Sequence, residues 1–192
     1  MPQSQTNEDR RMLLQVAAGI AAAGALGASS AQPTASKPAP ATGAPGDFDF
    51  LTGSWKIANR RLVDARWDEF DSEATVISLL GGVASVEELR IPARNFSGMG
   101  LRLLDVAHKR WADYWVNSKS GILPAQPSWG TFNHGVGIWD SVEEDGGKSV
   151  IVRGVWDRIT PDACRWYQAV SRDGGKSWSE NWVMHWTRTS AR

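Results

Sequence analysis

The chain has 192 residues, with 21 basic and 21 acidic side chains, which is room for one folded domain and a tail. Its net charge of zero removes the electrostatic attraction that drives non-specific nucleic-acid binding, so nucleic acid is not expected as a partner. Cys164 is the single cysteine, which excludes an intramolecular disulfide and a multi-thiolate metal site, and we expect no metal.

Residues 1–31 have the layout of an export signal. A polar start ends at Arg10-Arg11, and an almost uncharged run from Met12 to Ala28 follows before small residues. This run is rich in Ala and Gly and too short to span a bilayer comfortably, so a permanent anchor is the weaker alternative. The paired arginines resemble a twin-arginine signal. We expect a bacterial protein that is periplasmic or secreted, with no stable membrane anchor after processing.

Residues 32–46 consist almost entirely of Pro, Ala, Ser, Thr and Gly. This composition cannot bury a core and is typical of an extended linker. We therefore predict that the folded domain spans residues 47–192. All eleven tryptophans lie in it, outnumbering phenylalanine and tyrosine together. Such a tryptophan content implies a filled core, a lined pocket or a covered interface.

The pattern from Phe48 onward predicts consecutive short strands. Apolar and aromatic runs of five to ten residues are separated by Gly, Asp, Asn and Pro, which are turn residues. The expected strands are Ser54–Leu62, Glu69–Leu79, Val83–Ile91, Gly100–Asp105, Trp111–Asn117, Ser128–Phe132, Gly135–Trp139, Ser149–Arg158, Ala163–Ser171 and Trp178–Thr187. Short connections make neighbouring strands antiparallel.

The tryptophans at 178, 182 and 186 recur every four residues, a spacing that suits a helix or a strand. The residues between them decide for a strand, because Trp182, Met184 and Trp186 alternate with Val183 and His185. About ten antiparallel strands would leave costly edges in an open sheet. We therefore predict an all-β fold, a ten-stranded antiparallel up-and-down barrel, with a tightly curled sandwich as the alternative.

The opening segment FDFLTGSW (48–55) resembles the first-strand motif of the calycin barrels, the lipocalin and nitrobindin group. With WADYW (111–115), SRDGGKSW (171–178) and NWVMHWTR (181–188), it also resembles a bacterial family of uncharacterised function that carries an FDFLxGxW opening and a DGGKxWxxNWVM ending. The likeness spans 47–188. It implies a lipocalin-like barrel and no established chemistry.

The lipocalin resemblance implies a structural pair, in which Trp55 closes one end of the barrel and packs against Arg188 of the last strand. The nitrobindin resemblance raises haem as a cofactor, with His185 as its ligand, but no histidine pair has metal-ligand spacing and we expect no cofactor. The segment 171–178 also fits an Asp-box, which we interpret as a turn because the chain is too short for a propeller.

Several side chains are candidates for a mixed lining of the barrel. We predict that a ligand contacts Tyr114, Trp115, Arg153, Tyr167, Gln168, Asn181 and His185, with Arg102 among the polar groups. Acid–base chemistry is possible but is not indicated by any pattern in the sequence. The candidate carboxylates are those of Glu69, Glu87, Glu88, Asp113 and Glu180, and on alternating strands most such residues face water.

Three functions remain open at this stage. The first is an exported barrel that binds a small apolar or aromatic molecule. The second is an enzyme on the same barrel, of isomerase, cyclase or hydrolase type, that uses one acid–base residue. The third is a structural or interaction module whose tryptophans fill the core or cover a homodimer interface. No catalytic residue is assigned from the sequence, because fold alone does not fix function.

Overall fold

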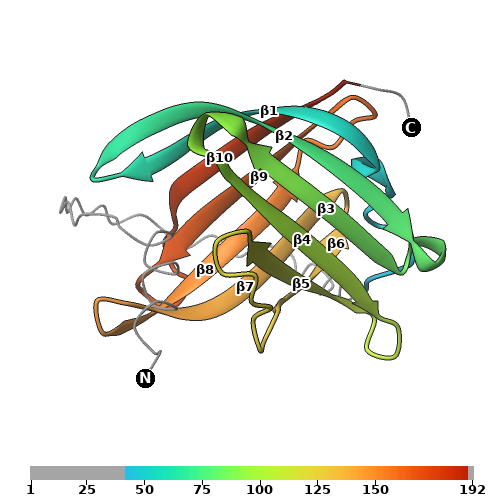
Figure 1. Cartoon of the computed structure of the whole chain (residues 1–192). Coiled ribbons are helices and arrows are strands. Elements are labelled where there is room, and N and C mark those ends of the chain that lie inside the picture. Colours follow the sequence, from blue (N-terminus) through green and yellow to red (C-terminus); the bar gives the residue numbers. More distant parts are fainter. Residues whose placement is uncertain (1–41, 190–192) are drawn as a thin grey trace, which may run out of the picture.

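A computed structural model describes residues 42–189, and in this part of the chain ten antiparallel strands close into one barrel (Figure 1). Each strand pairs with its neighbours in sequence, and β10 pairs with β1 to complete the circle. The strands are β1 (Gly53–Val63), β2 (Arg66–Leu79), β3 (Ala84–Ile91), β4 (Phe96–Asp105), β5 (Arg110–Asn117), β6 (Ser128–Asn133), β7 (Val136–Asp145), β8 (Lys148–Asp157), β9 (Ala163–Ser171) and β10 (Ser179–Arg188). The predicted all-β, ten-stranded up-and-down barrel is confirmed.

The expected strands correspond one to one with these ten, and β2, β4 and β7 each extend three or more residues beyond a predicted end. The prediction ends β7 at Trp139, whereas the strand continues to Asp145 through a run of acidic residues. The second half of β7 is held by its pairing with β8, which continues to Asp145 opposite Lys148. The β4 strand begins at Phe96 rather than at the predicted Gly100. The prediction started it too late because the glycine at position 98, which suggests a turn, lies inside the strand.

The two ends of the barrel differ. A segment before β1 crosses one end, which we call the closed end, and includes the short 3-10 helix η1 (Asp49–Leu51). The amide of Gly43 donates to Lys109 O at 2.6 Å, and the amide of Gly46 donates to Gly82 O at 2.9 Å. Gly43 and Gly46, which the prediction assigns to the linker, therefore bond to turns of the barrel. The predicted export signal and most of the linker lie outside the described residues.

The opposite end, which we call the open end, carries the hairpins that join β1 to β2, β3 to β4, β7 to β8 and β9 to β10, and the longer β5–β6 connection (Figure 1). A second 3-10 turn, η2 (Leu80–Gly82), lies at the closed end, and a third, η3 (Pro92–Arg94), lies at the open end. No helix among residues 42–189 is long and apolar enough to cross a membrane.

The closed end is filled by aromatic side chains. Phe48 packs edge-on against Trp111, with ring centroids 4.9 Å apart, and Trp156 packs against Trp186 at 5.3 Å. Five tryptophans in this cluster are at most 3% exposed: Trp55, Trp111, Trp139, Trp156 and Trp186. Burying this much apolar surface is the main stabilising contribution that the barrel makes.

Three further tryptophans lie on the outer surface, and each is covered by an arginine. The guanidinium carbon lies 4.6 Å from the ring centroid for Arg60 and Trp67, 3.7 Å for Arg110 and Trp129, and 4.0 Å for Arg153 and Trp178. These cation–π contacts shield apolar rings that would otherwise face water.

The Asp-box segment is a tight turn between β9 and β10. The Asp173 carboxylate accepts hydrogen bonds from the backbone amides of Lys176 and Ser177 and from the hydroxyls of Ser171 and Ser177. The hydrogen bonds from Ser177 lower the pKa of Asp173 far below its usual range, with smaller contributions from Ser171 and Lys176. All of these bonds are internal to the turn.

Candidate ligand-binding site

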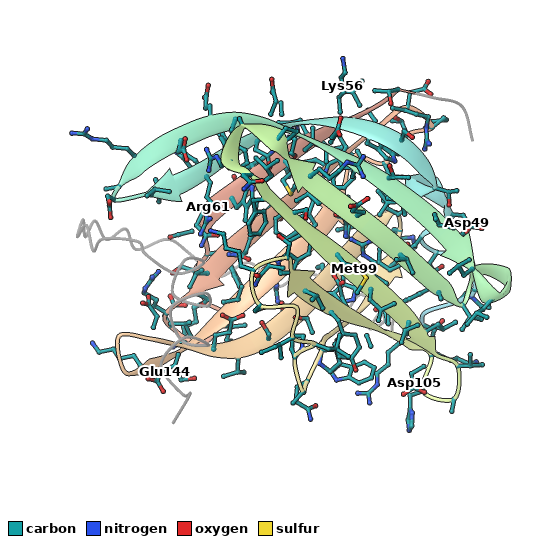
Figure 2. All side chains as sticks on the ribbon, in the orientation of Figure 1. Asp49, Lys56, Arg61, Met99, Asp105 and Glu144 are labelled. Carbon is teal, nitrogen blue, oxygen red and sulfur yellow. The ribbon has the colours of Figure 1, made fainter. Side chains whose placement is uncertain are left out.

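Strand alternation and the core cluster together identify the side chains that face the barrel interior. On β10, Trp182, Met184 and Trp186 pack in or against the core, so His185 between them faces outward. The same alternation places Asp113 and Trp115 of β5 inside, in line with the core residue Trp111. Figure 2 shows the side chains on the ribbon, many of them between the strands of the barrel.

A group of three charged residues, two of them buried, lies beyond the aromatic cluster, toward the open end. Arg102 of β4 donates a hydrogen bond from Nη2 to the Glu87 carboxylate of β3, and both side chains are at most 5% exposed. On the other side, Arg102 Nε lies 3.7 Å from Asp113 Oδ1 of β5. Gly100, whose missing side chain would meet Arg102, leaves room for the pair.

The Arg102 guanidinium is enclosed. Its carbon lies 5.1 Å from the Phe48 ring centroid and 5.5 Å from that of Trp156. Burial by itself lowers the pKa of Arg102, but the charges of Glu87 and Asp113 outweigh this effect and raise it. The Nε and Nη1 atoms are buried and have no hydrogen-bond acceptor among residues 42–189. Arg102 therefore acts on a ligand only through Asp113.

Asp113 is the member of this group that solvent reaches. Its side chain is 25% exposed, compared with 4% for Glu87. Burial raises the pKa of the Asp113 carboxyl to about 6; the positive charge of Arg102 opposes this rise and the negative charge of Glu87 adds to it. Near pH 6 this carboxyl changes between proton donor and proton acceptor.

Three tryptophans form the aromatic wall, which we define as Trp115, Trp166 and Trp182. All three face inward and are only half-buried, in contrast to the sealed tryptophans of the closed half. Trp166 and Trp182 meet edge to face, with centroids 5.8 Å apart. These three inward rings therefore keep contact with solvent, whereas the tryptophans of the closed half do not.

Polar side chains hold one ring of the aromatic wall, Trp182, in position. The Trp182 indole donates to Asn59 Oδ1 at 3.1 Å, and Asn59 Nδ2 donates to Ser72 Oγ at 2.7 Å. Gln168 Nε2 donates to Asn181 Oδ1 at 3.1 Å, near the β9–β10 register irregularity. Hydrogen-bonded, buried side chains of this kind fix the ring that they support.

Three of the predicted lining residues face the barrel interior, and two of them contact each other. Trp115 belongs to the aromatic wall and lies over Gly98 of β4. Gln168 and Asn181 are 8% and 3% exposed and bond to each other, as described above. Arg102 also faces inward, although it is enclosed.

The other four predicted lining residues face outward, and these assignments are corrected. Arg153 forms two hydrogen bonds to Asp140 and covers Trp178. Tyr167 lies under the Arg165 guanidinium on the outer surface, and His185 is exposed. Tyr114 stands opposite Leu101 in a row of outward side chains. Composition cannot distinguish the two faces of a strand when aromatic and polar residues occur on both.

A haem held inside the barrel by His185 does not fit these residues, because that side chain lies on the outer surface. Among residues 42–189, no group of three or more His, Cys, Asp or Glu side chains is placed to hold a metal ion. Cys164 is buried, and burial raises its pKa to about 12, so it is not a nucleophile in the folded protein.

The sequence reasoning did not assign Trp166, Trp182 or Asp113 to the site. Trp166 and Trp182 carry a usable signal, since both alternate in step with core residues of their strands. Alternation with Trp111 also places Asp113 on the inward face, but its raised pKa has no signal in the sequence, because it depends on burial and on Arg102 and Glu87 of two other strands.

Comparisons with known proteins add a structural likeness. No family model and no curated protein matches the chain. Among solved structures, the chain is similar to the S-type phycobiliprotein lyase CPES from Guillardia theta, with a TM-score of 0.48 and 14% identity. The alignment covers 76% of this chain and 92% of that protein.

Proposed function

We propose that the barrel binds a small apolar or aromatic molecule in the open half of its interior. The observation that carries this proposal is the contrast between sealed tryptophans at the closed end and the half-buried aromatic wall. Exposed aromatic surface inside a concave scaffold gains free energy when a ligand displaces water from it, at about 25 cal/mol per Å² of apolar area. Asp113 supplies a hydrogen-bonding group on the inner side of this space.

Titration with the neutral, apolar probe N-phenyl-1-naphthylamine tests this function. We expect saturable probe fluorescence with the wild-type protein. Trp166→Leu removes one ring of the wall and weakens binding by about tenfold, which corresponds to roughly 1.4 kcal/mol. Trp67→Leu is the matched control, because Trp67 is 42% exposed on the outer surface, and it leaves binding unchanged. Absence of saturable binding to the wild type, or equal losses in the two variants, would overturn the proposal.

A second candidate function is proton transfer by Asp113. The observation that favours it is a carboxyl with a pKa of about 6 that solvent reaches, because a general base works best when its pKa is near the working pH. In the simplest reaction, the carboxylate takes a proton from the carbon beside a ligand carbonyl and then returns a solvent-derived proton to the same carbon. The C–H electron pair forms the C=C bond of an enolate and returns to carbon on reprotonation, so the net change is hydrogen exchange at that carbon and no co-reactant is consumed.

Hydrogen exchange into an enolisable aromatic ketone tests the second candidate. We expect the wild-type protein to accelerate deuterium incorporation into 2-tetralone in D₂O, followed by NMR. Asp113→Asn removes the base and abolishes the acceleration while the neutral probe still binds. Equal exchange rates with and without the wild-type protein would leave binding as the function of the site.

We also propose export by the twin-arginine route, on the basis of residues 1–31 alone. Changing Arg10 and Arg11 together to lysine is expected to retain the precursor in the cytoplasm of a bacterial host, measured by cell fractionation. Lys37→Arg, in the predicted linker, is the control and leaves export unchanged. Unaltered export of the double variant would contradict this route.

A further inference from the structure

Arg61 lies on the inward face of β1 near the open end of the barrel. It continues the alternation of Trp55, Ile57 and Asn59, all of which are buried. Its guanidinium carbon lies 5.1 Å from the Trp182 ring centroid. Figure 2 labels Arg61 beside the β1–β2 hairpin, at the open side of the interior.

The Arg61 guanidinium has no hydrogen bond or ion pair within residues 42–189. Its neighbours are paired: Arg60 lies 3.7 Å from Glu180, and Arg94 donates to Asp68 at 2.8 Å. Arg61 is half-buried, and none of its nitrogen atoms is enclosed in the way that those of Arg102 are. Its N–H groups are therefore accessible, and no acceptor in the described part of the chain uses them.

A second guanidinium lies close to Arg61. Arg94 of η3 covers the Phe70 ring at 3.5 Å, and Phe70 lies 6.5 Å from Trp182. Burial lowers the pKa of Arg61, the positive charge of Arg94 lowers it further, and Asp68 opposes both effects. Arg61 and Arg94 therefore place two positive charges over neighbouring rings, and among the described residues only Arg94 has an ion-pair partner. A bound anion would stabilise this arrangement by offsetting the repulsion between the two charges.

We propose that Arg61 binds the carboxylate of a ligand whose apolar or aromatic body lies against Trp182 and Trp166. This inference rests on the proposed function and names its ligand class, an amphipathic monocarboxylate. The planar guanidinium offers two parallel N–H groups, which match the two oxygens of a carboxylate.

The charges inside the barrel set the orientation of such a ligand. Toward the closed end it meets Asp113 and Glu87, two carboxylates with one arginine between them. An acidic group that pointed inward would be repelled by this excess of negative charge once Asp113 is ionised. The carboxylate of the ligand therefore lies at the open end with Arg61, and its apolar body lies inside.

A matched pair of ligands tests the proposal. The probes are 2-naphthoate and 2-naphthylmethanol, which share one ring system and differ in charge, and tryptophan fluorescence reports binding. We expect the wild-type protein to bind the acid more tightly than the alcohol. Arg61→Gln is expected to leave the affinity for the alcohol unchanged and to lower the affinity for the acid by about tenfold. A tenfold loss corresponds to roughly 1.4 kcal/mol, the size of a charge-assisted hydrogen bond.

Two further variants sharpen the result. Arg66→Gln is the matched control, because Arg66 is exposed on the same hairpin and forms no ion pair within the described residues, and it leaves both affinities unchanged. Arg61→Lys keeps the charge but loses the planar donor pair, so its affinity for the acid is expected to fall between those of wild type and Arg61→Gln. It also serves as the test if Arg61→Gln does not fold.

The outcomes separate the two proposals. If neither probe binds the wild-type protein, the proposed function fails. If both bind with equal affinity, or if Arg61→Gln weakens acid and alcohol alike, the carboxylate site is wrong while the binding function stands. If Arg66→Gln weakens the acid as much as Arg61→Gln does, general surface charge accounts for the preference and the assignment to Arg61 is overturned.

Discussion

The guanidinium of Arg188, on the last strand, lies 4.1 Å from the ring centroid of Trp55, on the first. Arg188 also donates hydrogen bonds to three backbone carbonyls, those of Phe50, Thr52 and Pro161. One side chain therefore ties the β1–β10 seam, the segment before β1 and the β8–β9 turn together at the closed end. This is the arrangement that the lipocalin resemblance implies for these two residues.

Arg188→Gln is expected to destabilise the barrel substantially. It removes the cation–π contact and most of the hydrogen bonds to backbone carbonyls, so we expect a loss of about 2–4 kcal/mol in the free energy of unfolding. Urea denaturation measures this change. Arg66→Gln, which removes an exposed arginine at the opposite end, serves as the control and is expected to stay within about 0.5 kcal/mol of wild type. Equal stabilities of the two variants would contradict the role of Arg188.

Asp113 is expected to make the stability of the barrel decrease as the pH rises. Its pKa increases from 3.8 to about 6 on folding, so between these values the folded state binds more protons than the unfolded state. Folding is then less favourable at higher pH, and the effect levels off above pH 6. Each pKa unit corresponds to about 1.4 kcal/mol, so the total is at most about 3 kcal/mol.

The comparison of wild type with Asp113→Asn isolates this effect from that of other titrating groups. The unfolding free energies of both proteins are measured from pH 4 to pH 7. As the pH rises, the unfolding free energy of the variant is expected to increase relative to that of wild type. A difference that does not change with pH would mean that Asp113 has an ordinary pKa in the folded protein.

Gly98→Ala is expected to displace Trp115. A methyl group at this position would lie 2.2 Å from Cζ2 of the ring, which is too close for any real contact. We expect a loss of about 1–3 kcal/mol in stability, with altered near-UV circular dichroism. Gly154→Ala is the matched control, because its methyl group would lie 3.3 Å from Trp166 and requires only a small shift. If Gly98→Ala behaves like this control, the packing of Trp115 on β4 is incorrect.

Cys164 is expected to resist thiol reagents in the folded protein. Cys164 is 4% exposed, so a reagent cannot reach its sulfur. Burial also raises its pKa to about 12, so the reactive thiolate is not formed near neutral pH. Labelling with a maleimide is expected to be slow in native buffer and complete in guanidinium chloride. Rapid labelling without denaturant would show that the β9 interior opens readily.

The strand pattern was readable from the sequence, but the orientation of individual side chains was not. Turn residues and apolar runs located all ten strands because both are local signals. Trp115, Gln168 and Asn181 were placed inside correctly, whereas Tyr114 and His185 were not. A single strand shows alternation without showing which face is covered, and on this barrel arginines cover outward aromatic rings.

The sequence by itself determined the number and order of strands, the antiparallel arrangement and the abundance of tryptophan. Tertiary structure alone decided how the eleven rings are distributed: five fill the closed end, three form the aromatic wall and three lie outside under arginines. It also brought Glu87, Arg102 and Asp113 together from three strands and left Arg61 without an ion-pair partner among the described residues. These properties depend on strand register and barrel closure, which join residues distant in the chain and set the burial of each charge.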